Sequence, residues 1–255
     1  MQQRWYSFFS GDVANFVLRC VLNVVGICLI ACGIALSKLS ATGTSAISCV
    51  PAVLSDIAAL AGYPQLTLGV ITFIFNGLLI MAEIAMLRRR FHPVQLLQFL
   101  LLFVFSWAID AWMGLFAHIP LPNYAAQLAM LAVSMLVIAL GVFIEVKGNV
   151  LMLPGEAVVY TIAYVSKAPF HRCKVIFDTS CIVSAALISL LVMHGLFDVR
   201  EGSVLAALLV GNFVKMWSTL FGGLDALVPP AGKGYITPLI SERRGNGDSN
   251  AEVSV

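Results

Sequence analysis

The sequence predicts an all-α polytopic membrane protein with six transmembrane helices, arranged as two inverted three-helix repeats that each contain a broken or re-entrant segment. Three observations lead to this fold class. Hydrophobic residues make up 60% of the chain and charged residues only 11%, whereas soluble domains carry about 25% charged residues. Six apolar runs are long enough to cross a bilayer, which takes about 20 residues each. Two of these runs end in similar motifs.

The six apolar runs follow one another along most of the chain. The first is too long for the core of a cleaved signal peptide, so we expect it to be a retained span. Six cysteines lie in or beside apolar segments without a C-x-x-C spacing, which indicates buried apolar side chains and neither disulfides nor metal ligands. The runs cover residues 14–37, 67–87, 95–117, 125–145, 174–194 and 202–222.

Two further apolar stretches, 41–61 and 150–166, contain glycine and proline, which interrupt helical hydrogen bonding. Each could be a full span or a re-entrant hairpin. The distribution of basic residues decides between these alternatives. If both stretches are re-entrant, the Arg88-Arg89-Arg90 cluster and most other basic residues face the cytoplasm, with only Lys38 and Arg200 outside. The N- and C-termini are then both cytoplasmic.

The repeats are predicted from motifs at the ends of the third and sixth runs. The first reads Asp110-Ala-Trp112-Met-Gly-Leu115-Phe116, and the second reads Lys215-Met-Trp217-Ser-Thr-Leu220-Phe221. Three spans are an odd number, so the second repeat must insert upside down relative to the first, as in many transporters. We expect residues 1–120 to form one repeat, 121–227 the other, and 228–255 a disordered cytoplasmic tail.

The most specific candidate for a functional pair is Asp110 with Lys215, because they occupy equivalent repeat positions. A charge within the hydrocarbon costs at least about 2.5–3.5 kcal/mol and survives when it is paired or lines a wet cavity. We therefore expect the two to meet near the centre and to bind substrate or gate the path. The alternatives are that each reaches the membrane interface or that the pair is structural.

The two broken segments are the main candidate binding site. Unwound backbone at membrane depth is tolerated where protein buries it or where it lines a cavity. Helix N-termini there would suit an anion, and exposed carbonyls would suit a cation. Alternatives are a surface loop with an interfacial helix and, for Asp178, a local ion pair with Lys174. The candidate residues are Thr42, Gly43, Thr44, Ser45, Asn149, Gly155 and Glu156, with Asn76 and Asp178 from the second and fifth spans.

Several short motifs resemble those of a known family. They include Phe75-Asn76-Gly-Leu-Leu-Ile, Leu87-Arg88-Arg89-Arg90-Phe91, Ile109-Asp110 and Gly43-Thr44-Ser45. Together they resemble the YczE-type bacterial membrane proteins, relatives of the YitT-like group, most strongly over residues 26–115. Where that family often has a proline after the first Gly-Thr and a polar residue, this chain has Ser45-Ala46. The resemblance implies a bacterial inner-membrane protein and adds little about its substrate.

These patterns favour a secondary transporter or permease for a small polar or anionic solute. A passive channel and a substrate-capture or regulatory subunit of a membrane complex are the alternatives. No phosphate-binding, nucleophile or metalloprotease motif is present, so we expect no enzymatic activity, no cofactor and no metal. The expected partners are a small-molecule solute and the lipid bilayer, with no nucleic acid, and homo-oligomer formation stays open.

Overall fold

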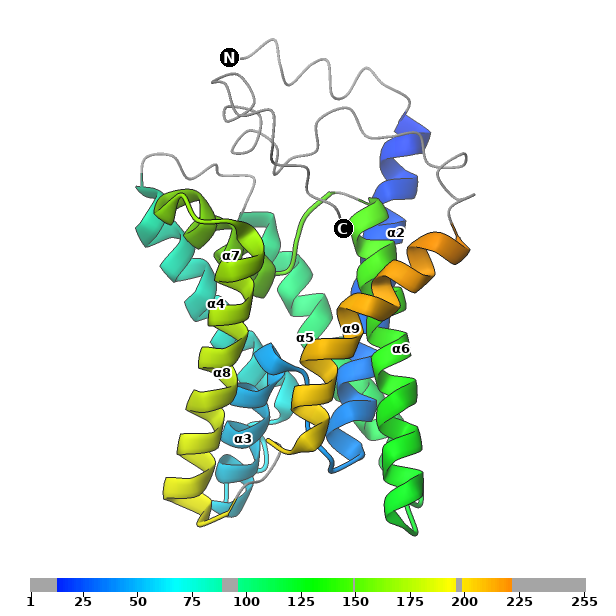
Figure 1. Ribbon diagram of the computed structural model, residues 1–255, viewed down its shortest axis with the longest axis vertical. Coiled ribbons are helices and arrows are strands. Elements are labelled where there is room, and N and C mark those ends of the chain that lie inside the picture. The colour runs from blue at the N-terminus through cyan, green and yellow to red at the C-terminus, as the bar shows by residue number, and fades with distance from the viewer. Residues whose placement is uncertain (1–12, 89–95, 149, 196–198, 222–255) are drawn as a thin grey trace.

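The computed structural model describes residues 13–88, 96–148, 150–195 and 199–221 (Figure 1). Within these ranges every assigned element is an α-helix and no residue lies in a β-strand, which confirms the all-α prediction. The described helices are α2 (Val13–Leu39), α3 (Ala46–Leu60), α4 (Leu68–Leu87), α5 (Gln98–Phe116), α6 (Tyr124–Gly148), α7 (Pro154–Ser166), α8 (Phe170–Met193) and α9 (Glu201–Leu220).

Five of the described helices, α2, α4, α5, α6 and α8, are long and apolar enough to cross a membrane. Their outer faces expose large apolar side chains, such as Leu191 at 74%, Ile176 at 69% and Trp107 at 67%. Soluble proteins rarely leave extended apolar surface in water, so these faces are suited to lipid. The chain is a helical membrane protein. A sixth span, predicted at 202–222, corresponds to α9. This helix is not among the five that are long and apolar enough to cross a membrane.

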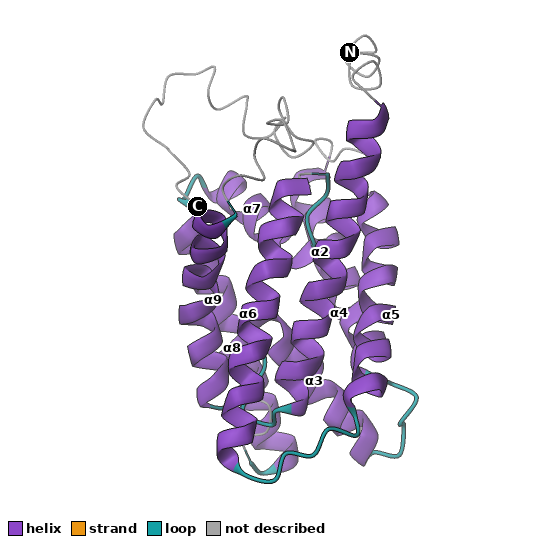
Figure 2. Cartoon of the chain, turned by 90° about the vertical axis from the view of Figure 1, so that its right-hand side faces the viewer, coloured by secondary structure: helices purple, strands orange, loops and turns teal. Residues whose placement is uncertain are grey.

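Helices α3 and α7 are too short to cross a bilayer. They contain 15 and 13 residues, which at ~1.5 Å per residue reach about 23 and 20 Å, against about 30 Å of hydrocarbon. They lie at opposite ends of the molecule in both views (Figures 1 and 2). Pro51 lies inside α3, and Pro154 is the first residue of α7. Each break in the helical path therefore precedes the short helix, and Pro51 does not end one.

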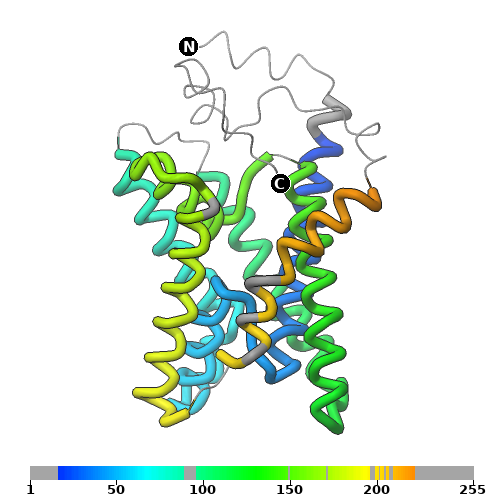
Figure 3. The backbone as a smooth tube through the Cα atoms, in the orientation of Figure 1, coloured from blue at the N-terminus to red at the C-terminus, as the bar shows by residue number. Residues whose placement is uncertain are grey.

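The helices pack in two groups, and the backbone trace shows α4, α7 and α8 on one side and α6 and α9 on the other (Figure 3). In one group, α2 packs against α5 and α6, and α6 packs against α9. In the other, α3 packs against α4 and α8, and α7 packs against the same two long helices. Contacts of α4 with α5 and of α3 with α9 join the groups. Each short helix thus lies between a neighbour from its own half of the chain and one from the other half.

The backbones of α2 and α6 come into direct contact at two glycines. A Cβ atom on Gly26 would lie 2.8 Å from the Gly141 carbonyl oxygen, and one on Gly141 would lie 2.7 Å from the Gly26 carbonyl oxygen. Further along the two helices, Gly33 and Gly148 also meet backbone atoms of the partner helix. Small residues allow this close approach, which is a common basis of helix association in membranes.

This crossing predicts a specific cost for adding one methyl group. We expect Gly141→Ala to destabilise the fold by about 1–3 kcal/mol, because the new Cβ would overlap backbone that cannot move aside. Gly77→Ala on α4 is the matched control, because a Cβ there meets nothing within 4 Å. Both changes bring the same gain in helix propensity, about 1 kcal/mol. Thermal unfolding in detergent is the measurement, and equal midpoints for the two variants would contradict the packing.

Candidate functional site

The turn before α3 is held by buried hydroxyl groups, here called the hydroxyl cluster: Ser37, Ser40, Thr42, Thr44 and Ser203. Ser37 Oγ donates to the Gly43 carbonyl oxygen at 2.8 Å, and the hydroxyls of Ser40 and Thr42 lie 2.8 Å apart. The Thr44 amide donates to Ser203 Oγ at 3.1 Å. Because buried polar groups need partners, these bonds hold the unwound segment against the start of α9.

Gly43 permits the close contact between this turn and α9. Its φ of 129° favours glycine, and a Cβ there would lie 2.6 Å from the Ser203 backbone nitrogen. The Gly202 amide also donates to the Thr42 carbonyl oxygen at 2.9 Å. Of the predicted site residues in this segment, Thr42 and Thr44 are fully buried, while Ser45 is half-buried and donates to a neighbouring hydroxyl. A role for the four in solute binding stays a prediction.

The turn before α7 is held by an acid and an amide instead. Glu145, near the end of α6, accepts a hydrogen bond from the Leu153 amide at 3.1 Å through Oε1. Asn23 of α2 donates from Nδ2 to the Leu151 carbonyl oxygen at 2.9 Å. Glu156, in the first turn of α7, is half-buried and interacts electrostatically with Glu145. Two acids thus lie close together at the positive end of a helix.

The N-terminal ends of the two short helices meet inside the molecule. A Cβ on Gly155 of α7 would lie 3.0 Å from Cδ1 of Ile47 on α3 and 3.9 Å from Oδ1 of Asn76 on α4. Asn76 is 5% exposed, and its amide donates to the Thr72 carbonyl oxygen at 2.9 Å. The structure therefore brings Gly155 and Asn76 together, as the predicted site requires. Asn149 lies outside the described residues.

Asp178 occupies the place on α8 that Asn76 occupies on α4. It forms an ion pair with Lys174, one turn earlier, at 3.2 Å. Cys181, one turn further along α8, packs against Cys49 of α3. Each of the two polar residues thus lies on a long helix that packs against the short helix of the other half of the chain. The local ion pair is confirmed, and a role for Asp178 in solute binding stays a prediction.

Asp110 has a different partner from the one predicted. Its Oδ2 accepts from the Thr67 hydroxyl at 2.6 Å, and its Oδ1 accepts from the Gly69 amide at 2.8 Å. The free N–H groups at the start of α4 attract a carboxylate, so Asp110 caps that helix. The Lys215 side chain is exposed on α9. Among the ion pairs of the described residues, none joins the two, and the expectation that they meet is wrong.

Sequence reasoning did not include three of the buried polar residues among the candidate site residues. Asn23 is 1% exposed, Glu145 is 3% exposed, and Glu83 is 2% exposed and hydrogen-bonds with Gln98 and Thr161. The available signal was a polar residue within an apolar helix, which is costly unless it is paired or functional. These residues link helices that are distant in sequence, so their partners could not be read from spacing.

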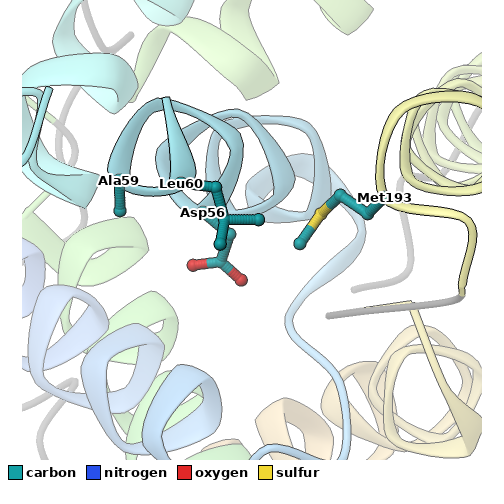
Figure 4. A pocket seen from close by; sticks show the side chains of 4 residues that line it. All are labelled: Asp56, Ala59, Leu60 and Met193. Atoms are coloured by element: carbon teal, nitrogen blue, oxygen red, sulfur yellow. The ribbon is translucent and has the colours of Figure 1, made fainter. Parts of the chain in front are cut away.

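A cavity of about 370 Å³ opens between the C-terminal end of α3 and that of α8 (Figure 4). Beside it, Lys38 of α2 forms an ion pair with Asp56 at 2.7 Å and donates to the Ala52 carbonyl oxygen at 3.3 Å. The pair ties the end of α2 to α3. The cavity therefore lies at the opposite end of α3 from Gly155. Its lining residues are Asp56, Ala59, Leu60 and Met193.

Double-mutant cycles can test whether Asp110 interacts with the start of α4 or with Lys215. Because Asp110 and Thr67 share a hydrogen bond, we expect Asp110→Asn and Thr67→Val to couple by about 0.5–3 kcal/mol. Asp110→Asn and Lys215→Met should be additive within about 0.5 kcal/mol. The measurement is thermal or denaturant unfolding of the single and double variants in detergent. A coupling with Lys215 that exceeds the coupling with Thr67 would restore the pair.

Comparison with known proteins gives a family and no activity. Among the described residues, no group of three or more His, Cys, Asp or Glu could hold a metal ion. No curated protein and no solved structure matches the chain. A model of a family of unknown function, DUF6198, matches residues 17–219, which is most of the sequence. The match begins at the fifth residue of α2 and ends one residue before the end of α9. The chain therefore belongs to the DUF6198 family.

Proposed function

We propose that this protein is a secondary transporter or permease that moves a small polar or anionic solute through the interface between two inverted repeats. The first repeat consists of α2 to α5 and the second of α6 to α9. The solute site lies where the N-terminal ends of α3 and α7 meet. The observation that carries the proposal is the approach of Gly155 to Ile47 beside Asn76, between two short helices from opposite ends of the molecule.

The exchange of helix contacts between the halves supports inverted repeats. The contact of α2 with α5 corresponds to that of α6 with α9, and the contact of α3 with α8 corresponds to that of α7 with α4. The duplicated motif also forms the same local structure twice. Trp112 stacks on Phe116 with ring centroids 5.3 Å apart, and Trp217 stacks on Phe221 at 5.5 Å. A duplicated and inverted unit accounts for both observations.

The chemistry of the meeting point favours a polar or anionic solute. A helix N-terminus presents free N–H groups and the positive end of the helix dipole. The first residue of α7 is a proline without an N–H, and Gly155 follows it without a side chain. Gly155 is therefore the first residue of α7 that has a backbone N–H to donate. The side chains nearest to it from other helices are those of Ile47 and Asn76.

The links between the two helix groups fit a carrier better than an open pore. Ile47 packs directly against Gly155 where the two short helices meet, which is the contact expected of a carrier that is closed at its centre between two open states. Polar contacts join the groups at separate places, with Asp110 at the start of α4 and Lys38 at the end of α2. A rocking motion of one group against the other would open the centre from alternate sides. The alternatives are a passive channel and a substrate-capture subunit, and measurements of solute flux distinguish them from a carrier.

The basic residues support a cytoplasmic location for the end that contains α7. Arg88, Lys147, Lys167 and Lys174 lie at or near the helix ends on that side (Figure 1). Lys38 lies at the opposite end, where α2 finishes. Basic residues are concentrated on the cytoplasmic side of bacterial membrane proteins. This orientation fits the bacterial inner membrane, and the similarity to YczE-type and YitT-like proteins is part of the same proposal.

The transport proposal is tested by binding and flux with purified protein. A panel of small organic anions and zwitterions is screened by thermal shift, and compounds that stabilise the protein are tested for uptake into liposomes. We expect saturable uptake, with Gly155→Ala weakening it by at least about tenfold, or roughly 1.4 kcal/mol. Gly77→Ala is the control, one residue from Asn76 but with nothing near its Cβ. Uptake that rises linearly would favour a channel, and no uptake would contradict transport.

The topology is tested by labelling single cysteines in a variant without the six native ones. Tyr63, 56% exposed, lies between α3 and α4, and Lys167 lies between α7 and α8. We expect an impermeant maleimide to label Tyr63→Cys in intact cells, and Lys167→Cys only after permeabilisation, because the short helices return to the side from which they entered. Labelling of both positions from the same side would reject the inverted arrangement.

A further inference from the structure

Glu145 is a buried acid with one satisfied oxygen and one free oxygen. It is 3% exposed. Oε1 accepts the hydrogen bond from the Leu153 amide at 3.1 Å, while Oε2 has no hydrogen-bond partner among the described residues. A Cβ on Gly26 would lie 2.7 Å from the Glu145 backbone nitrogen, so the backbone of α2 covers this part of α6. An ionised carboxylate so enclosed loses its hydration without gaining a full set of donors.

A second buried side chain beside the same segment, that of Asn23, also has an oxygen without a hydrogen-bond partner. Asn23 is 1% exposed, and its Nδ2 holds the Leu151 carbonyl oxygen. Its Oδ1 has no hydrogen-bond partner among the described residues. Asn23 and Glu145 therefore bind Leu151 and Leu153 of the same unwound segment, and each has one side-chain oxygen without a hydrogen-bond partner. Two unsatisfied acceptors beside the same segment indicate a missing donor.

The charged groups around Glu145 do not supply that donor. On α7, the acid Glu156 acts on Glu145 electrostatically, and Tyr160 follows one turn later. On α2, Arg19 donates to the Gly148 carbonyl oxygen at 3.5 Å. On α6 itself, Lys147 Nζ lies 5.6 Å from the centroid of the Phe143 ring. On α9, the Lys215 side chain is exposed. Glu156 thus places a negative charge beside Glu145.

We propose that Glu145 is a proton-binding site. The proton is carried on Oε2, and the resulting hydroxyl donates a hydrogen bond to the side-chain oxygen Oδ1 of Asn23. A proton supplies the donor that both oxygens lack, and it removes the negative charge beside Glu156. The site needs no co-reactant, because the proton is taken from water and returned to water. Its place is at the contact of α6 with the start of α7, between the two helix groups.

Proton release would change the link between the helix groups. A charged Glu145 would strengthen its hydrogen bond from the Leu153 amide, because a charge-assisted bond is roughly twice as strong as a neutral one. The positive end of α7 would stabilise the same charge, while Glu156 would repel it. Protonation therefore biases the position of α7 against α6. This coupling role rests on the proposed transport function, whereas proton binding itself does not.

The test is infrared spectroscopy of the purified protein without any added solute. A protonated acid in an apolar site gives a carboxyl C=O band that shifts in heavy water. We expect this band in the wild type at neutral pH and the loss of its Glu145 component in Glu145→Gln, while any component from Glu83, the other buried acid, is retained and is identified by its loss in Glu83→Gln. Asp56→Asn is the matched control, because it also removes one acid but from an ion pair with Lys38. It should leave the band in place. Thermal unfolding confirms that the variants are folded.

A second variant keeps the test decisive if Glu145→Gln does not fold. Glu145→Asp keeps an acid in a shifted position, so the band should move in frequency while its area is retained. An unchanged band in a folded Glu145 variant would overturn the proposal, as would a wild type without the band. So would removal of the band by sodium chloride but not by potassium chloride, which would assign a metal cation to the site. No outcome depends on whether a transported solute has been found.

Discussion

The contact between α2 and α6 is the constraint on which the rest of the structure depends. α2 is the most buried of the candidate spans, with 61% of its apolar window inside the protein against 17% for α8. Because Gly26 and Gly141 let the two backbones touch, the crossing leaves no room for a larger residue at either position. The same approach covers the backbone of Glu145 and removes it from water. The close crossing of α2 and α6 therefore sets how these two helices pack and also buries Glu145.

The two unwound segments are stabilised by different chemistry, although they occupy comparable places before a short helix. The hydroxyl cluster holds the first with neutral hydrogen bonds, such as that between Thr44 and Ser203. Glu145 and Asn23 hold the second. Neutral hydroxyl bonds do not respond to pH, whereas a carboxyl group can gain or lose charge. If the halves arose by duplication, one copy has kept a fixed anchor and the other has gained a group that can switch.

Sequence patterns predicted the local features and failed where distant segments meet. Apolar length and interrupting glycines located the long helices and the two short ones, because both depend on neighbouring residues. Asp110 was misjudged because its donor, Gly69, lies 41 residues away on another helix. The contact of Thr44 with Ser203, 159 residues away, could not be read from the sequence either, and a solute-binding role for Thr42 and Thr44 stays a prediction. Asn76, chosen through its predicted repeat position, lies beside Gly155, and its role in solute binding stays a prediction.

The acids of the apolar segments differ in how they are satisfied, and this difference locates function better than their depth does. Asp56 and Asp178 have a lysine within ion-pair distance, and Asp110 has an amide and a hydroxyl. Each of these three acids thus has a partner that balances its charge or satisfies its oxygens within the fold. Glu145 has one donor for two oxygens, and a second acid, Glu156, nearby. A membrane protein can retain such a group only if something else neutralises it part of the time, and a proton is the smallest ligand that does so.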